Sequence, residues 1–174
     1  MYRIYLFGTP RIFKNEEIVQ ISRRKSWALL AYLVVTSQPH RRDELATLLY
    51  PGHDQSSARS NLRRDLSELK SYLDDGFLLL EREQISLIST NQLWVDINEF
   101  LEHVEYVRMH HQHQQADRQS SMCEDCKVRL IKAIELYSAD FMSGFTISGS
   151  REFEDWQFFQ SVNLRRVLSE ICRN

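Results

Sequence analysis

The chain has 174 residues, of which 43% are hydrophobic and 26% are charged, and its formal net charge is -2. This composition excludes a disordered chain, and no apolar run reaches the ~18 residues that a membrane-spanning helix needs. The start of the chain lacks a signal-peptide pattern, and three cysteines are too few for a disulfide framework, so we expect a cytoplasmic protein without a membrane partner.

Charge is unevenly distributed along the chain. Residues 1–80 contain 12 Lys or Arg and 9 Asp or Glu, whereas residues 81–174 contain 10 Lys or Arg and 15 Asp or Glu. A weakly basic half joined to an acidic half predicts two domains with different partners. We place these domains at residues 1–95 and 96–174.

The first segments predict a small antiparallel sheet. Residues 2–7 alternate in polarity and are rich in β-formers, and two turn signals, Gly8-Thr9-Pro10 and Asn15-Glu16-Glu17, separate them from two more short apolar segments. Two helices are expected next. Residues 24–37 are apolar on nearly every side, which indicates a buried helix, and residues 41–50 form a shorter one that Pro51-Gly52 ends.

Residues 55–73 predict a third helix with one buried stripe. Its apolar residues follow each other at intervals of four, four, three and four: Ala58, Leu62, Leu66, Leu69 and Leu73. A helical wheel places basic and hydroxyl side chains on the neighbouring and opposite arc: Arg59, Ser60, Arg63, Arg64, Ser67 and Lys70. We place Asp65 and Glu68 on the remaining flank, beside Asn61. Such a face suits a DNA groove, although most helices of this pattern are ordinary solvated helices.

Residues 77–89 predict a β-hairpin with a polar tip at residues 81–84. The expected order is therefore a sheet, three helices and a hairpin. This order indicates an α+β winged helix, in which the hairpin is the wing.

The second half is expected to be helical. Asp96 and Glu99 have capping-box spacing at the start of one helix, whereas residues 108–121 are polar and histidine-rich and indicate a loop or a frayed helix end. Helical spacing resumes over residues 123–137 and again over residues 151–171.

The last helix has two apolar faces. Its main stripe contains Phe153 and Trp156, whereas Phe158, Phe159 and Val162 fall on another side. We expect something further to pack there, and we interpret the chain as the N-terminal part of a longer protein.

Four spaced segments of the first half carry a resemblance to a known family. FGTPRIF, SRRKSWALLAYLV, HRRDELATLLYPG and ARSNLRRDLSELK resemble the DNA-binding domain of SARP-class bacterial transcriptional activators, a winged helix of the OmpR/PhoB type. The resemblance covers roughly residues 1–97 and implies that helix 55–73 enters the major groove of duplex DNA while hairpin 77–89 lies at the minor groove. Tyr50 departs from the Trp expected before the proline.

Two later segments extend this resemblance. AIELYSADFMSGF and SREFEDWQFFQSVNLRRVLSEI look like the opening of the bacterial transcriptional activation domain, an all-α array of tetratricopeptide-like helix pairs. The resemblance implies RNA polymerase and a second copy on tandem DNA repeats as further partners.

The expected function is sequence-specific transcriptional regulation, most simply activation. The DNA-contacting residues are then the basic and hydroxyl set of helix 55–73, with Arg41, Arg42 and Arg82, and residues 23–25 are further candidates for phosphate contacts. The alternative is a protein–protein interaction adaptor with a degenerate winged helix. The modest positive charge and the acidic wing tip favour the adaptor, and the one-sided basic face favours DNA.

A His/Cys cluster is the one constellation with metal-binding potential. Cys123 and Cys126 form a CxxC pair, and the preceding segment contains His110, His111 and His113. Two thiolates and two imidazoles form the ligand set of a structural zinc site, for which we name Cys123, Cys126, His111 and His113. Core cysteines beside a solvated histidine segment, or a redox pair, are the alternatives. We expect no enzyme, because the sequence has only five Gly, no phosphate-binding loop and no nucleophile motif.

Overall fold

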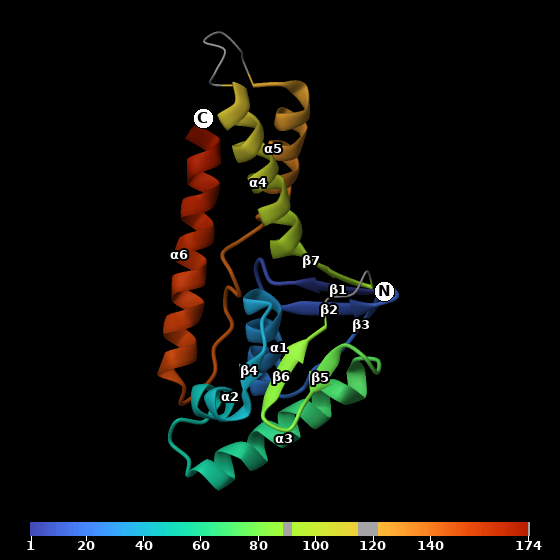
Figure 1. Ribbon diagram of the computed structural model, residues 1–174, viewed down its shortest axis with the longest axis vertical. Coiled ribbons are helices and arrows are strands. Elements are labelled where there is room, and N and C mark those ends of the chain that lie inside the picture. The colour runs from blue at the N-terminus through green and yellow to red at the C-terminus, as the bar shows by residue number, and fades with distance from the viewer. Residues whose placement is uncertain (89–91, 115–121, 174) are drawn as a thin grey trace.

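A four-stranded sheet at the N-terminus organises the first half of the protein (Figure 1). The computed structural model describes residues 1–88, 92–114 and 122–173, without the side chains of residues 111–114. Strands β1 (Tyr2–Tyr5), β2 (Arg11–Lys14) and β3 (Glu17–Ile18) pair antiparallel, as the sequence predicts. Strand β7 (Leu93–Val95) was not expected; it pairs with β1 in parallel and completes the order β3-β2-β1-β7.

Three helices follow the first strands, and their positions confirm the predicted ones. They are α1 (Arg24–Thr36), α2 (Arg42–Leu49) and α3 (Gln55–Tyr72). Helix α1 is buried on most of its surface, as expected for an element packed between others. Helix α3 starts where the Asp54 carboxylate accepts a hydrogen bond from the Ser57 N–H at 3.1 Å.

The predicted hairpin consists of β5 (Leu78–Leu80) and β6 (Gln84–Leu87). A short strand before α2, β4 (His40–Arg41), adds to β6 and makes a three-stranded sheet in the order β4-β6-β5. Residues 89–91, which include the predicted end of the hairpin, lie outside the described part of the chain. The order of sheet, three helices and hairpin agrees with a winged helix.

The second half contains α4 (Asp96–Gln114), α5 (Glu124–Leu136) and α6 (Arg151–Arg173). The prediction of a loop or frayed end from residue 108 was wrong as far as residue 114, because tertiary contacts extend α4: Arg108 forms an ion pair of 2.7 Å with Glu170 on α6. Residues 115–121 are not described. Within the described ranges, none of the helices combines the length and apolarity that a bilayer crossing requires.

Asp96 joins the two halves of the chain. Its carboxylate is 2% exposed and accepts hydrogen bonds from the backbone N–H groups of Leu6 and Phe7 at 2.8 and 2.9 Å. Burial raises the pKa of Asp96. The expected capping box therefore takes another form, since Glu99 accepts a hydrogen bond from the Trp94 indole at 3.0 Å.

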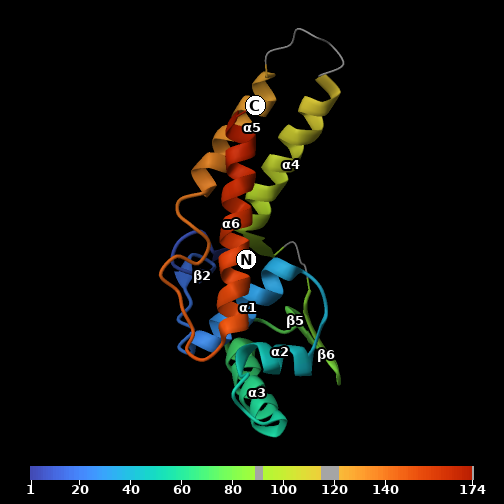
Figure 2. The same ribbon diagram turned by 90° about the vertical axis from the view of Figure 1, so that its left-hand side faces the viewer.

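Helix α6 runs alongside both halves, from its start near α2 to the far end of α4 and α5 (Figure 2). The Ser150 hydroxyl donates to the Leu48 carbonyl, and the Trp156 and Tyr32 rings lie 4.9 Å apart. The buried residues of both halves form one continuous core. The domain boundary near residue 95 therefore stays a prediction. Helix α3 lies at the opposite end of the molecule from the α4–α5 pair (Figure 1).

Candidate nucleic-acid interface

The outer face of α3 is basic, as the helical wheel predicts. Five side chains of the predicted set are exposed and Ser60 is half-buried, whereas the predicted apolar stripe is buried; the exposed ones are Arg59, Arg63, Arg64, Ser67 and Lys70. The helical half of the chain leaves this face open. A partner as large as a duplex can therefore approach α3.

Four arginines from three elements line one hollow beside α3. Arg42 of α2, Arg59 and Arg63 of α3, and Arg82 between the wing strands surround a space of about 370 Å³, with Leu62 at its base. The Arg42 backbone N–H donates to the Glu83 carbonyl at 2.9 Å and thereby joins α2 to the wing tip. Guanidinium groups clustered around one space attract phosphate, because each carries a positive charge and several N–H donors.

Arg59 already has an anionic partner. Its guanidinium contacts both carboxylate oxygens of Asp43 on α2, with an Nη2–Oδ2 distance of 2.6 Å. Hydrogen bonding to Arg59 holds the pKa of Asp43 below its usual value. Arg59 is thus held in position at the edge of the hollow and has less capacity to bind a second anion.

Arg63 and Arg64 are less constrained. Arg63 Nε donates to the Arg59 carbonyl at 3.4 Å, and Arg64 Nη1 contacts the Asn61 amide oxygen at 3.5 Å. Both contacts are at the long limit of a hydrogen bond. Neither guanidinium has a carboxylate within salt-bridge distance in the described part of the chain, so of the three arginines of α3 these two are best placed for a ligand.

The remaining predicted DNA-contacting residues lie around this face. The Arg82 side chain is 95% exposed and lies 3.6 Å from the Glu83 carboxylate, which reduces the positive charge of the wing tip. Arg42 Nε donates to the Glu81 carbonyl at 3.0 Å, and Arg41 is exposed at the start of α2. Lys70 lies at the other end of α3.

The three basic residues at positions 23–25 have internal partners. Arg23 Nε forms an ion pair of 2.7 Å with Asp65, Arg24 Nε donates to the Thr146 carbonyl at 2.6 Å, and Lys25 Nζ donates to the Leu49 carbonyl at 2.6 Å. Burial lowers the pKa of Lys25. These cations bind groups of the protein itself, on α2, α3 and the segment between α5 and α6, and do not belong to the interface.

Asp65 was placed on an exposed flank and is in fact fully buried. It accepts a hydrogen bond of 2.5 Å from the Tyr50 hydroxyl in addition to its ion pair with Arg23. Burial, and then the Asp65 carboxylate, raise the pKa of Tyr50. The helical wheel could have found this position, because seven residues after Ala58 return to within about 20° of the buried stripe.

Glu68 likewise belongs to the packing and not to the open face. It is half-buried, and one carboxylate oxygen accepts hydrogen bonds from the backbone N–H groups of Ser22 and Arg23 at 3.0 and 3.2 Å. A carboxylate at the start of α1 binds amides that have no partner within the helix. Both acidic groups therefore position α3 without facing the ligand side.

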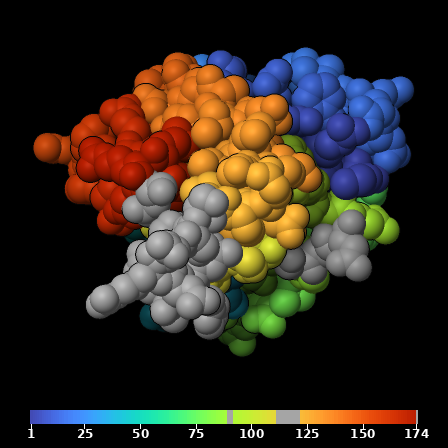
Figure 3. Space-filling view, turned by 90° about the horizontal axis from the view of Figure 1, so that it is seen from above, coloured from blue at the N-terminus to red at the C-terminus, as the bar shows by residue number. Residues whose placement is uncertain are grey.

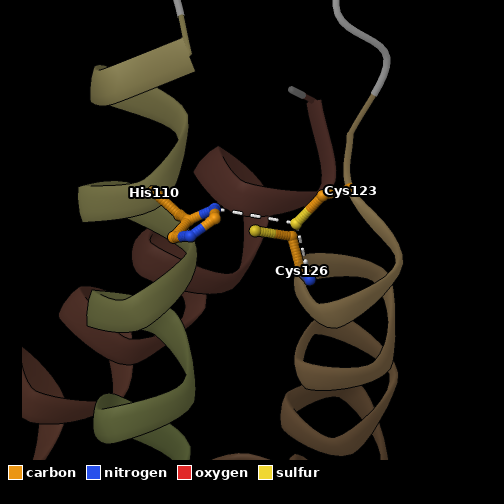
Figure 4. A group of neighbouring side chains, drawn as sticks. All are labelled: His110, Cys123 and Cys126. Atoms are coloured by element: carbon orange, nitrogen blue, oxygen red, sulfur yellow. Dashed lines mark hydrogen bonds between the residues drawn. The ribbon is translucent and has the colours of Figure 1, made fainter.

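The predicted metal-binding residues come together only in part. His110 on α4 points toward Cys123 and Cys126 at the start of α5, with 3.6 Å between His110 Nδ1 and Cys123 Sγ (Figure 4). His111 and His113, the histidines named from the sequence, have side chains outside the described residues. The sulfur of Cys123 accepts the Cys126 N–H at 3.4 Å, which lowers the pKa of Cys123, and burial raises the pKa of Cys126 to about 11.

Comparison with known proteins finds similarity in structure alone. No protein-family model and no curated protein matches the sequence. Among solved structures, the chain is similar to EmbR of Mycobacterium tuberculosis, determined in complex with a low-affinity phosphopeptide, with a TM-score of 0.72 and 18% identity. The alignment covers 98% of this chain and 45% of EmbR, so the chain spans less than half the length of that protein. The likeness shows that the two chains share a fold over the aligned region.

Proposed function

We propose that the protein is a transcriptional regulator that binds duplex DNA through α3 and activates transcription. The observation that carries the proposal is the open basic face of α3, with four arginines around one hollow beside it. Helix α3 enters the major groove, and the hairpin of β5 and β6 lies along the adjacent minor groove. The similarity in fold to EmbR, a SARP-family regulator, supports this use of the helix.

The proposed DNA contacts differ between cations that have a carboxylate partner in the protein and cations that have none. Arg63 and Arg64 lack a carboxylate partner among the described residues and reach base edges or phosphates, while Ser60 and Ser67 allow close approach of the backbone. The other cations contact phosphates: Arg41, Arg42, Arg59, Lys70 and Arg82. Arg59 contributes least of these because Asp43 already neutralises it.

A protein-interaction adaptor is the second candidate function. It is favoured by the exposed aromatic side chains of α6, since Phe158 and Phe159 are 63% and 66% exposed. The two functions are compatible in one chain, because these rings and the basic face of α3 lie on different elements. Evidence for the adaptor function would therefore not exclude DNA binding, which has to be measured directly.

The test measures affinity for random-sequence duplex DNA by fluorescence anisotropy over a range of salt concentrations. Counterion release predicts a log–log slope of about -0.9 for each phosphate contact, so we expect a slope steeper than about -3. Arg63→Ala with Arg64→Ala flattens the slope, and Lys132→Ala on the exposed surface of α5 is the matched control. A flat salt dependence would leave the adaptor as the better function. Footprinting upstream of the protein's own gene then identifies a specific site.

A further inference from the structure

Three side chains with metal-binding atoms converge at the end of the molecule opposite α3. His110 belongs to the last described turns of α4, and Cys123 and Cys126 belong to the first turn of α5 (Figure 4). The Nδ1 or Nε2 atom of His110 and the two Sγ atoms all lie within 4.8 Å of one another. Seen from this end, α5 lies beside the C-terminal part of α6 (Figure 3).

The His110–Cys123 separation, a hydrogen-bond contact in this structure, equals that of two ligands on one tetrahedral metal ion. Zinc lies about 2.3 Å from a thiolate sulfur and about 2.0–2.1 Å from an imidazole nitrogen, so tetrahedral angles place the two ligand atoms about 3.6 Å apart. The distance from His110 Nδ1 to Cys123 Sγ is 3.6 Å. Two sulfurs on one zinc lie about 3.8 Å apart, and all three ligand atoms here lie within 4.8 Å of one another.

Neighbouring groups hold the three ligands in place before any ion arrives. The His110 ring stacks on Tyr106, one helical turn earlier, with 5.3 Å between ring centroids and 10° between planes. Cys123 is the N-cap of α5, and the Cys126 N–H fixes its sulfur. Cys126 is buried, which reduces its freedom to turn away. An arrangement already close to the bound geometry lowers the entropic cost of binding an ion.

We propose that His110, Cys123 and Cys126 form a zinc-binding site that joins the end of α4 to the start of α5. Two thiolates neutralise the charge of one Zn²⁺, and each thiol releases its proton when it coordinates. The soft sulfur ligands select zinc over magnesium or calcium, which take oxygen ligands. Among the described residues three ligands are present, and water or a small external ligand completes the tetrahedron.

The ion would act as a cross-link at the open end of the α4–α5 pair. The two helices pack along their length, and the three ligands lie at one end of the pair. Binding to the folded state alone stabilises that state in proportion to the logarithm of the zinc concentration. The inference concerns the helical half and does not depend on DNA binding.

The test uses the full chain, produced without a histidine tag and kept reduced. We expect about one zinc ion per chain after purification, and about one Co²⁺ after exchange, with the sulfur-to-cobalt charge-transfer band of a thiolate site. Zinc affinity is measured by competition with a chromogenic chelator. Cys126→Ser and His110→Ala are each expected to lower it at least about 100-fold.

Cys172→Ser is the matched control, because this cysteine is exposed on α6 and lies outside the cluster. It should retain the ion and the cobalt band. Helix content by circular dichroism separates loss of a ligand from loss of the fold in each variant. Sub-stoichiometric zinc with no charge-transfer band, or an equal loss in Cys172→Ser, would each overturn the proposal.

Discussion

The two sides of α3 use the same charged residue types for different purposes. On the buried side, the Asp65 carboxylate binds Arg23 and Tyr50, and on the exposed side Arg63 and Arg64 face solvent without a carboxylate partner among the described residues. A buried charge is tolerated only with partners, whereas an exposed charge costs little and remains available to a ligand. Sequence alone marks both sides as charged, but the location of the partner determines which arginine supports the fold and which can bind DNA.

The largest expected effect is on the buried side. Asp65→Ala removes the only carboxylate that pairs with the Arg23 guanidinium within the described chain and leaves the buried Tyr50 hydroxyl without its acceptor, so we expect a loss of about 3 kcal/mol in the free energy of unfolding. Urea denaturation measures this loss. Asp75→Ala, in the exposed turn after α3, is the control, and equal midpoints for the two variants would contradict the assigned role.

Arg63→Ala tests the exposed side. We expect a loss of about 1–3 kcal/mol in DNA-binding free energy if Arg63 contacts a base edge, with little change in unfolding free energy because the side chain makes one long hydrogen bond. Anisotropy titration at fixed salt measures the affinity. An unchanged affinity for the footprinted site would remove Arg63 from the interface.

Asp43→Asn tests the intermediate case, in which an exposed arginine has a partner. Release of Arg59 should tighten DNA binding, but by less than about fivefold, because exposed ion pairs are weak. The pKa of Asp43 is depressed in the folded protein. The Asp43–Arg59 ion pair is therefore intact at any pH above the ordinary carboxyl pKa, and it is lost only as the pH falls through the folded-state pKa. Between about pH 6 and 8 the difference between the variant and the parent should be constant. Glu135→Gln on α5 provides the control for charge alone.

Lys70→Ala should give the smallest effect. Lys70 is exposed at the far end of α3, and a single phosphate contact contributes equally to all sequences. We expect the magnitude of the salt-dependence slope to fall by about 1, with no change in sequence preference. A change in preference would instead place Lys70 at a base.

Periodic features were predictable, and features that depend on contacts between distant segments were not. The stripe of α3 and the apolar surface of α1 follow from spacing alone, and the structure confirms both. Strand β7 has too few residues to give a pattern and forms because β1 offers it an open edge. Helix α4 continues beyond the expected end, and Arg108 and His110 in the added part contact α6 and the start of α5.

The same division applies to the candidate sites. The CxxC pair and the neighbouring histidines are visible in the sequence. Which histidine faces the sulfurs depends on the rotation of α4 against α5, and in the structure His110 faces them. The hollow beside α3 contains side chains 40 residues apart, from Arg42 to Arg82, and no local pattern indicates that they meet.

The order of the helices and hairpin, the buried stripe of α3 and the residue types on its outer face can all be read from the amino-acid order, because they follow from periodicities within one element. Which charges are neutralised, such as those of Asp65 and Arg59, and which have no carboxylate partner among the described residues, such as that of Arg63, depends on the packed fold. Neutralisation depends on distances of a few ångström between segments far apart in the chain, and those distances exist only after the segments have packed.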